Sequence, residues 1–67
     1  MASLDQHIEM AQRHVLEGRR IVTAQRLRII RGEVDGDDAH RLLANFERSL
    51  EIFEQDLARL LAQRDSK

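Results

Sequence analysis

Mostly apolar residues recur along the chain at alternating spacings of four and three positions, in two separate series. The first series is Leu4, Ile8, Ala11, Val15, Gly18, Val22, Gln25 and Ile29, and the second is Ala39, Leu43, Phe46, Leu50, Phe53, Leu57, Leu60 and Arg64. Side chains at this spacing return to one face of an α-helix, whereas a β-strand needs strict alternation. The pattern therefore predicts an all-α protein built from two long helices that pack along a shared seam.

Local motifs predict where the first helix begins and ends. Ser3, followed three residues later by Gln6, is typical of a capping box at a helix N-terminus. Gly32 suits the left-handed residue that follows the last turn of a helix. We predict one domain over residues 1–67, with a first helix over about residues 4–31, a turn over residues 32–35 and a second helix over about residues 36–64. Because the connection is this short, the helices fold back as an antiparallel hairpin.

The connecting stretch IIRGEVDGDD combines glycines with several acids, which raises the alternative of a calcium-binding loop. An EF-hand loop needs glycine at its sixth position and glutamate at its twelfth. A loop that starts at Asp35 has Phe46 at the twelfth position, and one that starts at Glu33 has Asp38 at the sixth. We therefore predict a turn without a cation site, in which Asp35 is the N-cap of the second helix and the acids after it lie near the positive helix end.

The antiparallel register follows from the position of the turn. Positions whose numbers sum to about 67 face each other, which places Val22 near Phe46, and Gly18 near Leu50 and Phe53. A glycine inside a helix costs up to about 1 kcal/mol relative to alanine. We interpret Gly18 as room for a close approach of the two helices or for a phenylalanine ring.

A hairpin of this size has more apolar surface than its own seam covers. The chain has 67 residues and no cysteine, and small domains without disulfides or a metal commonly gain stability by oligomerising. We expect self-association into a four-helix bundle with two-fold symmetry, most simply a homodimer. The expected oligomer interface comprises Val15, Gly18, Val22, Gln25, Leu42, Phe46, Leu50, Phe53, Leu57 and Leu61.

Two features of this arrangement allow more than one interpretation. Gln25, a polar residue in the seam, either sets the register near the two-fold axis or lies at the edge of the seam and reaches water. A second apolar strip on the first helix, made of Leu16, Leu27 and Ile30, forms a second interface for a tetramer or for another protein, or else consists of scattered surface residues.

Charge is unevenly divided between the two helices, although the chain carries a net charge of only −1. Residues 4–31 hold six arginines and three acids, and residues 36–64 hold four arginines and six acids. A basic helix followed by an acidic one favours ion pairs within the molecule. The alternative is that Arg13, Arg20 and Arg31 contact the phosphates of a nucleic acid. The lack of tyrosine and tryptophan disfavours this alternative, because these rings commonly stack on bases.

The sequence offers no set of residues typical of an enzyme, a cofactor site or a metal site. His7 and His14 lie two helical turns apart, and His40 lies near the turn, at the other end of the hairpin from His7. No apolar run approaches the roughly 18 residues of a membrane span, and the first ten residues lack the basic start and apolar stretch of a signal peptide. We expect a cytoplasmic protein that has no catalytic residues, binds no cofactor and does not associate with membranes.

Two resemblances add to this interpretation. In length and layout the chain is similar to small plasmid-encoded RNA-binding regulators that form dimeric four-helix bundles from helical hairpins; no motif is shared, so no RNA-binding residue is transferred. The stretches HVLEGRRIVTAQ and GEVDGDDAHRLLANFERSLEIFEQDL, between His14 and Leu57, resemble short uncharacterised proteobacterial helical-hairpin proteins. That resemblance implies a bacterial cytoplasmic protein and no particular activity.

The expected function follows from shape and association. We expect a small non-enzymatic protein-interaction or structural module that acts as a homo-oligomeric helical bundle and binds itself and another protein. The alternative is a regulator that binds structured RNA or DNA through the arginines of the first helix.

Overall fold

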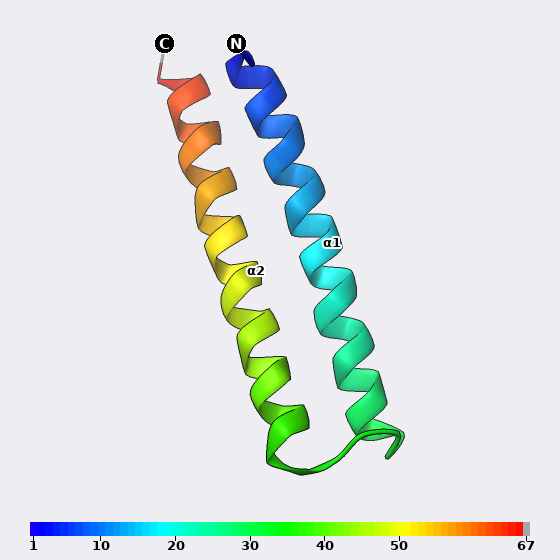
Figure 1. Ribbon diagram of the computed structural model, residues 1–67. Coiled ribbons are helices and arrows are strands. Elements are labelled where there is room, and N and C mark those ends of the chain that lie inside the picture. Colours follow the sequence, from blue (N-terminus) through cyan, green and yellow to red (C-terminus); the bar gives the residue numbers. More distant parts are fainter. Residues whose placement is uncertain (67) are drawn as a thin grey trace.

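Two antiparallel helices make up the fold. In the computed structural model, which describes residues 1–66, α1 is formed by Leu4–Ile30 and α2 by Gly36–Asp65, and no strand occurs in this part of the chain. The hairpin is 49 Å long and 18 by 14 Å across, with both termini at one end and the turn at the other (Figure 1). The all-α arrangement of two packed helices is thus confirmed. The helix bounds differ from the expected ones only in that Arg31 is the C-cap of α1 and Asp65 belongs to α2.

The first helix begins with the predicted capping box. The backbone N–H of Ser3 donates to Oε1 of Gln6 at 2.8 Å, and the N–H of Gln6 donates to Oγ of Ser3 at 3.2 Å. N–H groups at the start of a helix have no partner within it, so these two reciprocal bonds stabilise the first turn.

The first helix ends in a Schellman motif centred on Gly32. The N–H of Gly32 donates to the carbonyl of Ile29 at 3.1 Å, and the N–H of Glu33 donates to the carbonyl of Arg28 at 2.9 Å. Gly32 has a φ of 71°, in the left-handed region that glycine enters without the steric penalty of a Cβ atom. The prediction that Gly32 ends the first helix is confirmed.

The start of α2 differs in part from the prediction. Asp35 occupies the N-cap position with an extended backbone, as expected, but its carboxylate accepts no capping hydrogen bond. The next residue, Gly36, has a φ of 81°. The chain therefore changes direction through a second left-handed glycine. The prediction that Asp35 is the N-cap of α2 is confirmed for its position, but its side chain does not cap the helix.

Both heptad series lie in the seam except for the exposed Arg64 at the end of the second, and the two helices are buried to different degrees. The residues of α1 that are buried are Ile8, Ala11, Val15, Gly18, Val22 and Gln25. On α2 only Ala39 and Leu60 are buried, whereas the residues that are half-buried are Leu43, Phe46, Leu50, Phe53, Asp56, Leu57 and Leu61. The mostly small side chains of α1 lie deep between the helices, and the larger ones of α2 extend past the edges of the seam. The hairpin alone therefore leaves part of its own seam in contact with solvent.

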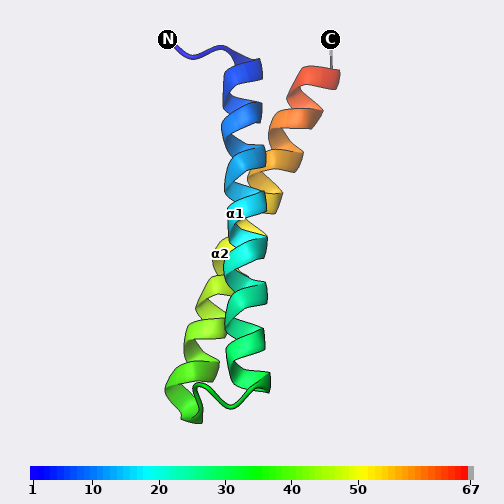
Figure 2. The same cartoon turned by 90° about the vertical axis from the view of Figure 1, so that its right-hand side faces the viewer.

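Gly18 lies where the helices are in close contact. A Cβ atom added to Gly18 would lie 3.2 Å from Cδ1 of Leu50 and 3.7 Å from Cδ2 of Phe53. Figure 2 shows that the helices cross near their midpoints, which is the level of these residues. The interpretation of Gly18 as room for a close approach is confirmed.

Gln25 forms a hydrogen bond between the two helices of one chain. Its side chain is only 3% exposed, and its Nε2 donates to the backbone carbonyl of Ala39 at 3.1 Å. The interpretation in which Gln25 reaches water at the edge of the seam is therefore wrong. Its amide instead joins α1 to the first turn of α2.

Candidate interaction surfaces

Two interhelical ion pairs close one side of the seam. A guanidinium nitrogen of Arg19 lies 3.6 Å from a carboxylate oxygen of Glu54, and the corresponding distance from Arg26 to Glu47 is 2.9 Å. The arginines are seven residues apart and so are the glutamates, so both pairs lie on the same side of the hairpin, which we call the ion-pair side. Pairing between the basic and the acidic helix is thus confirmed. Because these side chains are about half exposed, each pair contributes only about 0.2–1 kcal/mol.

The opposite side of the seam is marked by a different row of residues. His14, Ile21 and Arg28 follow one another at intervals of seven and therefore lie along one edge of α1. The ring centroid of His14 lies 5.2 Å from that of Phe53 on α2, so this edge borders the seam. Ile21 follows Arg19 by two residues, or about 200° around the helix, so the row lies away from the ion pairs. We call this the apolar side.

Both helices contribute large exposed side chains to the apolar side. On α1, Met10 lies one turn before the row and is 55% exposed, and Ile21 is 40% exposed. On α2, Leu42 lines a groove with Arg28 and is 43% exposed, and Ile52, ten residues later and about 80° further round the helix, is 57% exposed at the outer edge of this side. No interhelical ion pair lies on this side within residues 1–66.

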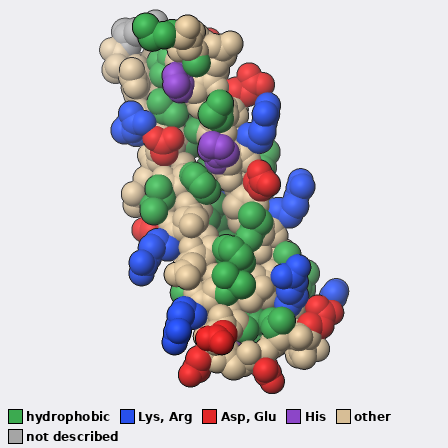
Figure 3. Space-filling view, viewed as in Figure 1, with side chains coloured by type: hydrophobic (Ala, Val, Ile, Leu, Met, Phe, Trp, Pro, Cys, Tyr) green, Lys and Arg blue, Asp and Glu red, His purple; other side chains and the backbone are tan. Residues whose placement is uncertain are grey.

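The two phenylalanines of α2 extend this apolar surface. Phe46 and Phe53 are seven residues apart and only half-buried. At the crossing, α1 presents Gly18, which has no side chain to cover the ring of Phe53. Figure 3 shows this side of the molecule: hydrophobic side chains run along the middle of the face, between the helices, and charged side chains lie mostly at its edges and at the turn.

The second strip expected from the sequence lies on the outside of α1. Leu16 and Leu27 are eleven residues apart, or about three turns, and Ile30 lies three residues further on, so the three side chains share one surface. They are 62%, 41% and 78% exposed, respectively. The strip therefore stays largely exposed in the hairpin, although Leu16 and Ile30 also line grooves beside α2.

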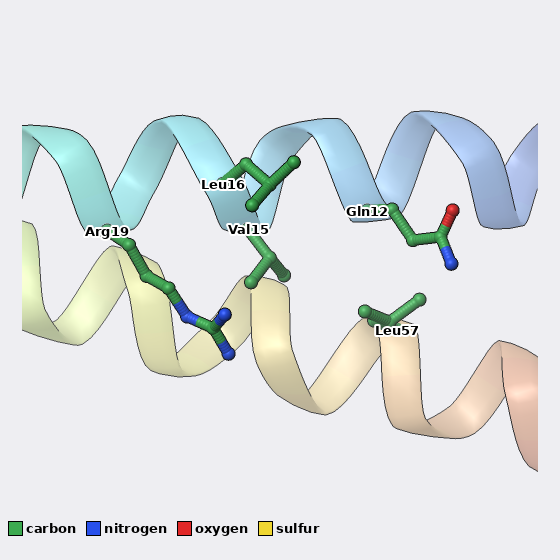
Figure 4. A pocket seen from close by; sticks show the side chains of 5 residues that line it. All are labelled: Gln12, Val15, Leu16, Arg19 and Leu57. Carbon is green, nitrogen blue, oxygen red and sulfur yellow. The ribbon is translucent and has the colours of Figure 1, made fainter.

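Two open grooves border the ion-pair side. One has a volume of about 320 Å³ and is lined by Gln12, Val15, Leu16, Arg19 and Leu57. The other, of about 200 Å³, is lined by Arg26, Ile29, Ile30, His40 and Leu43. In the first groove, Val15 and Leu57 point between the helices and Arg19 extends across α2 (Figure 4). Each groove thus has an apolar floor and an arginine of an ion pair at its rim.

The residues expected at the oligomer interface fall into two groups. Four of them are already buried between α1 and α2, so the hairpin itself covers Val15, Gly18, Val22 and Gln25. The other six are exposed or half-buried, namely Leu42, Phe46, Leu50, Phe53, Leu57 and Leu61. Leu61 packs against the core cluster formed by residues 8, 11 and 60. Ile52 was not among the expected interface residues because it lies outside the main series; the signal that could have identified it is its position one turn before Asp56, on the edge of α2 that begins with Leu42.

The three arginines proposed to contact nucleic acid lie on the surface of α1 and at its end. Arg13 lies 3.7 Å from Glu9, and both side chains are exposed. Arg20 lies seven residues after Arg13 on the same edge of the helix, whereas Arg31 is the C-cap residue. Arg20 and Arg31 form no ion pair within residues 1–66. Because Arg31 follows Arg20 by eleven residues, or about three turns, the three arginines lie along one edge of the first helix, spread over about 27 Å.

The histidines do not assemble into a site. His7 and His40 are exposed, and the ring of His14 packs beside that of Phe53. Among the described residues, no group of three or more histidines, cysteines or acids has the arrangement to hold a metal ion. Within the same residues, neither helix combines the length and the apolar character needed to cross a membrane.

Comparison with known proteins gives no functional assignment. No protein-family model, no curated protein and no solved structure matches the chain. Functional inference therefore rests on the surfaces of the hairpin.

Proposed function

We propose that this chain is a small non-enzymatic module that self-associates into a helical bundle, most simply a four-helix homodimer, and binds another protein through its outer surface. The observation that supports the proposal is the size of the apolar surface that the hairpin leaves uncovered. Beyond Met1, seven large apolar residues are at least 40% exposed, whereas the buried apolar core of residues 1–66 comprises six residues, two of which are alanines.

The free energies involved favour association. Full burial of a leucine, isoleucine or methionine side chain stabilises a protein by about 1.5–3 kcal/mol relative to exposure. Association of two molecules costs about 4–15 kcal/mol in lost freedom of motion, so a partner must cover several such side chains at once. The exposed residues are grouped on surfaces that one helical partner can cover, which supports an oligomer over an isolated hairpin.

The strip of Leu16, Leu27 and Ile30 is the surface that we assign to another protein. It lies on the outside of α1, and its three side chains are among the exposed large apolar residues. A partner helix with apolar residues at matching intervals fits such a strip.

Binding of structured RNA or DNA by the arginines of α1 has less support. Arg19 and Arg26 are engaged by glutamates of α2, and Arg13 lies beside Glu9. Only Arg20 and Arg28 of α1 and Arg31 at its C-cap form no ion pair within the described residues, and the chain as a whole is slightly acidic.

Sedimentation equilibrium tests self-association directly. We expect a dimer or a larger oligomer at micromolar concentrations, with helix content by circular dichroism that falls on dilution as the oligomer dissociates. A folded monomer at all accessible concentrations contradicts the proposal.

A gel shift with structured RNA and duplex DNA at low and moderate salt, using wild type and Arg13→Glu/Arg20→Glu, tests the alternative. A shift that the double variant abolishes supports nucleic-acid binding instead.

A further inference from the structure

Interhelical ion pairs lie on only one of the two sides of the seam, and this difference indicates where a second hairpin docks. On the ion-pair side, Arg19–Glu54 and Arg26–Glu47 lie between the grooves. A second copy packed there would remove four charged groups from water, and the cost of desolvating ion pairs often exceeds their attraction. Docking on that side is therefore disfavoured.

We infer that the second copy packs on the apolar side, covering Met10, Ile21, Leu42 and Ile52 together with the rings of Phe46 and Phe53; this inference rests on the proposed self-association. These side chains come from both helices, so two copies placed face to face bury a continuous surface from all four helices. Charged groups on this side include Arg28 and the Asp56–Arg59 pair of α2, whose atoms lie 2.6 Å apart, so docking here desolvates one ion pair, against two interhelical pairs on the ion-pair side.

The dimensions of the hairpin agree with this docking mode. A face 49 Å long and 18 Å wide is comparable in extent to the roughly 800 Å² per partner that a stable protein interface buries. These outer dimensions thus allow an interface of that size when the partner covers nearly the whole face.

Cysteine labelling distinguishes the two sides, because the chain contains no cysteine of its own. Ser49 is exposed and lies on the apolar side, seven residues after Leu42. Ala58 is also exposed and lies nine residues further along α2, about 180° around the helix. Ser49→Cys and Ala58→Cys are therefore conservative substitutions that report on opposite sides.

The measurement is the rate of thiol labelling by a small maleimide at concentrations below and above the dissociation constant found by sedimentation. For Ser49→Cys we expect labelling about ten-fold slower in the associated form, since the reaction then proceeds through the dissociated fraction. For Ala58→Cys we expect the same rate at both concentrations.

Independently, Ile52→Arg is expected to shift the protein to monomer, whereas Leu16→Arg is expected to leave the dimer intact.

The outcomes separate this inference from the proposed function. A wild-type protein that stays monomeric overturns both. An oligomer in which Ala58→Cys is protected, alone or together with Ser49→Cys, overturns the choice of the apolar side and leaves self-association standing. If Ile52→Arg unfolds, the two cysteine variants still decide between the sides, because neither introduces a charge.

Discussion

Substitution of Gly18 tests whether packing or helix propensity governs the centre of the hairpin. A Cβ atom at this position would lie 3.2 Å from Cδ1 of Leu50, which is the end of a flexible, half-buried side chain. Gly18→Ala removes the cost of a helical glycine, about 0.8–1 kcal/mol, and requires only a small shift of Leu50. We therefore expect Gly18→Ala to stabilise the protein, by less than about 1 kcal/mol.

Gly18→Leu is expected to have the opposite effect. Leucine has nearly the same helix propensity as alanine, but its further carbons occupy the space between α1 and α2 where Leu50 and Phe53 already lie. Overpacking of this kind costs about 1–3 kcal/mol, which exceeds the gain in propensity and leaves a net loss of up to about 2 kcal/mol. For a domain of this size each kcal/mol corresponds to a change in Tm of roughly 4–8 °C.

Thermal unfolding followed by circular dichroism measures both effects. All variants are compared at one protein concentration, because the Tm of an oligomer depends on concentration. Ala58→Leu is the control: it adds a leucine at an exposed position of α2, where we expect a change within about 0.5 kcal/mol. A Gly18→Leu variant whose Tm rises as much as that of Gly18→Ala would refute the reasoning, since propensity alone would then explain the site.

Three further predictions concern the ends and the polar contacts of the hairpin. Ser3→Ala is expected to lower the free energy of unfolding by about 0.5–2 kcal/mol, because the capping box at the start of α1 is lost; urea denaturation measures it. Gln25→Leu is expected to change stability by less than about 1 kcal/mol, because the Ala39 carbonyl keeps its helical partner. Gln25→Ala also leaves a cavity in the seam, so its free energy of unfolding is expected to be about 2 kcal/mol lower than that of Gln25→Leu. Equal stabilities of the two variants would contradict the view that the side chain at position 25 fills the seam. A double-mutant cycle with Arg26→Ala and Glu47→Ala is expected to give a coupling of about 0.2–1 kcal/mol that falls at high salt, and a coupling unaffected by salt would argue against a surface ion pair.

Features that depend on neighbouring residues were predictable from the sequence. The alternation of four and three residues predicts both helices, because the period of an α-helix is a local property. The capping box at Ser3 and the left-handed Gly32 are confirmed for the same reason: each depends on hydrogen bonds within a few residues. The close approach at Gly18 was predictable because a short turn fixes which residues of α1 and α2 face each other.

Features that depend on which neighbour covers a side chain were decided only by the tertiary structure. The spacing indicates that Val15, Val22 and Gln25 face another helix, but it does not distinguish a helix of the same chain from one of a second copy; the fold buries them within the hairpin. Likewise, the sequence alone does not show that Ile52 remains exposed. The fold leaves its side chain 57% exposed, near the half-buried ring of Phe53 that Gly18 does not cover.

The sequence by itself thus determined the helices, the turn and the residues of the seam, because backbone hydrogen bonding and helical periodicity act over a few residues. The tertiary structure decided which edge of the seam carries ion pairs and which remains apolar. That difference arises because Arg19 and Arg26 meet Glu54 and Glu47 on one side, whereas small residues of α1 leave the large side chains of α2 partly uncovered on the other.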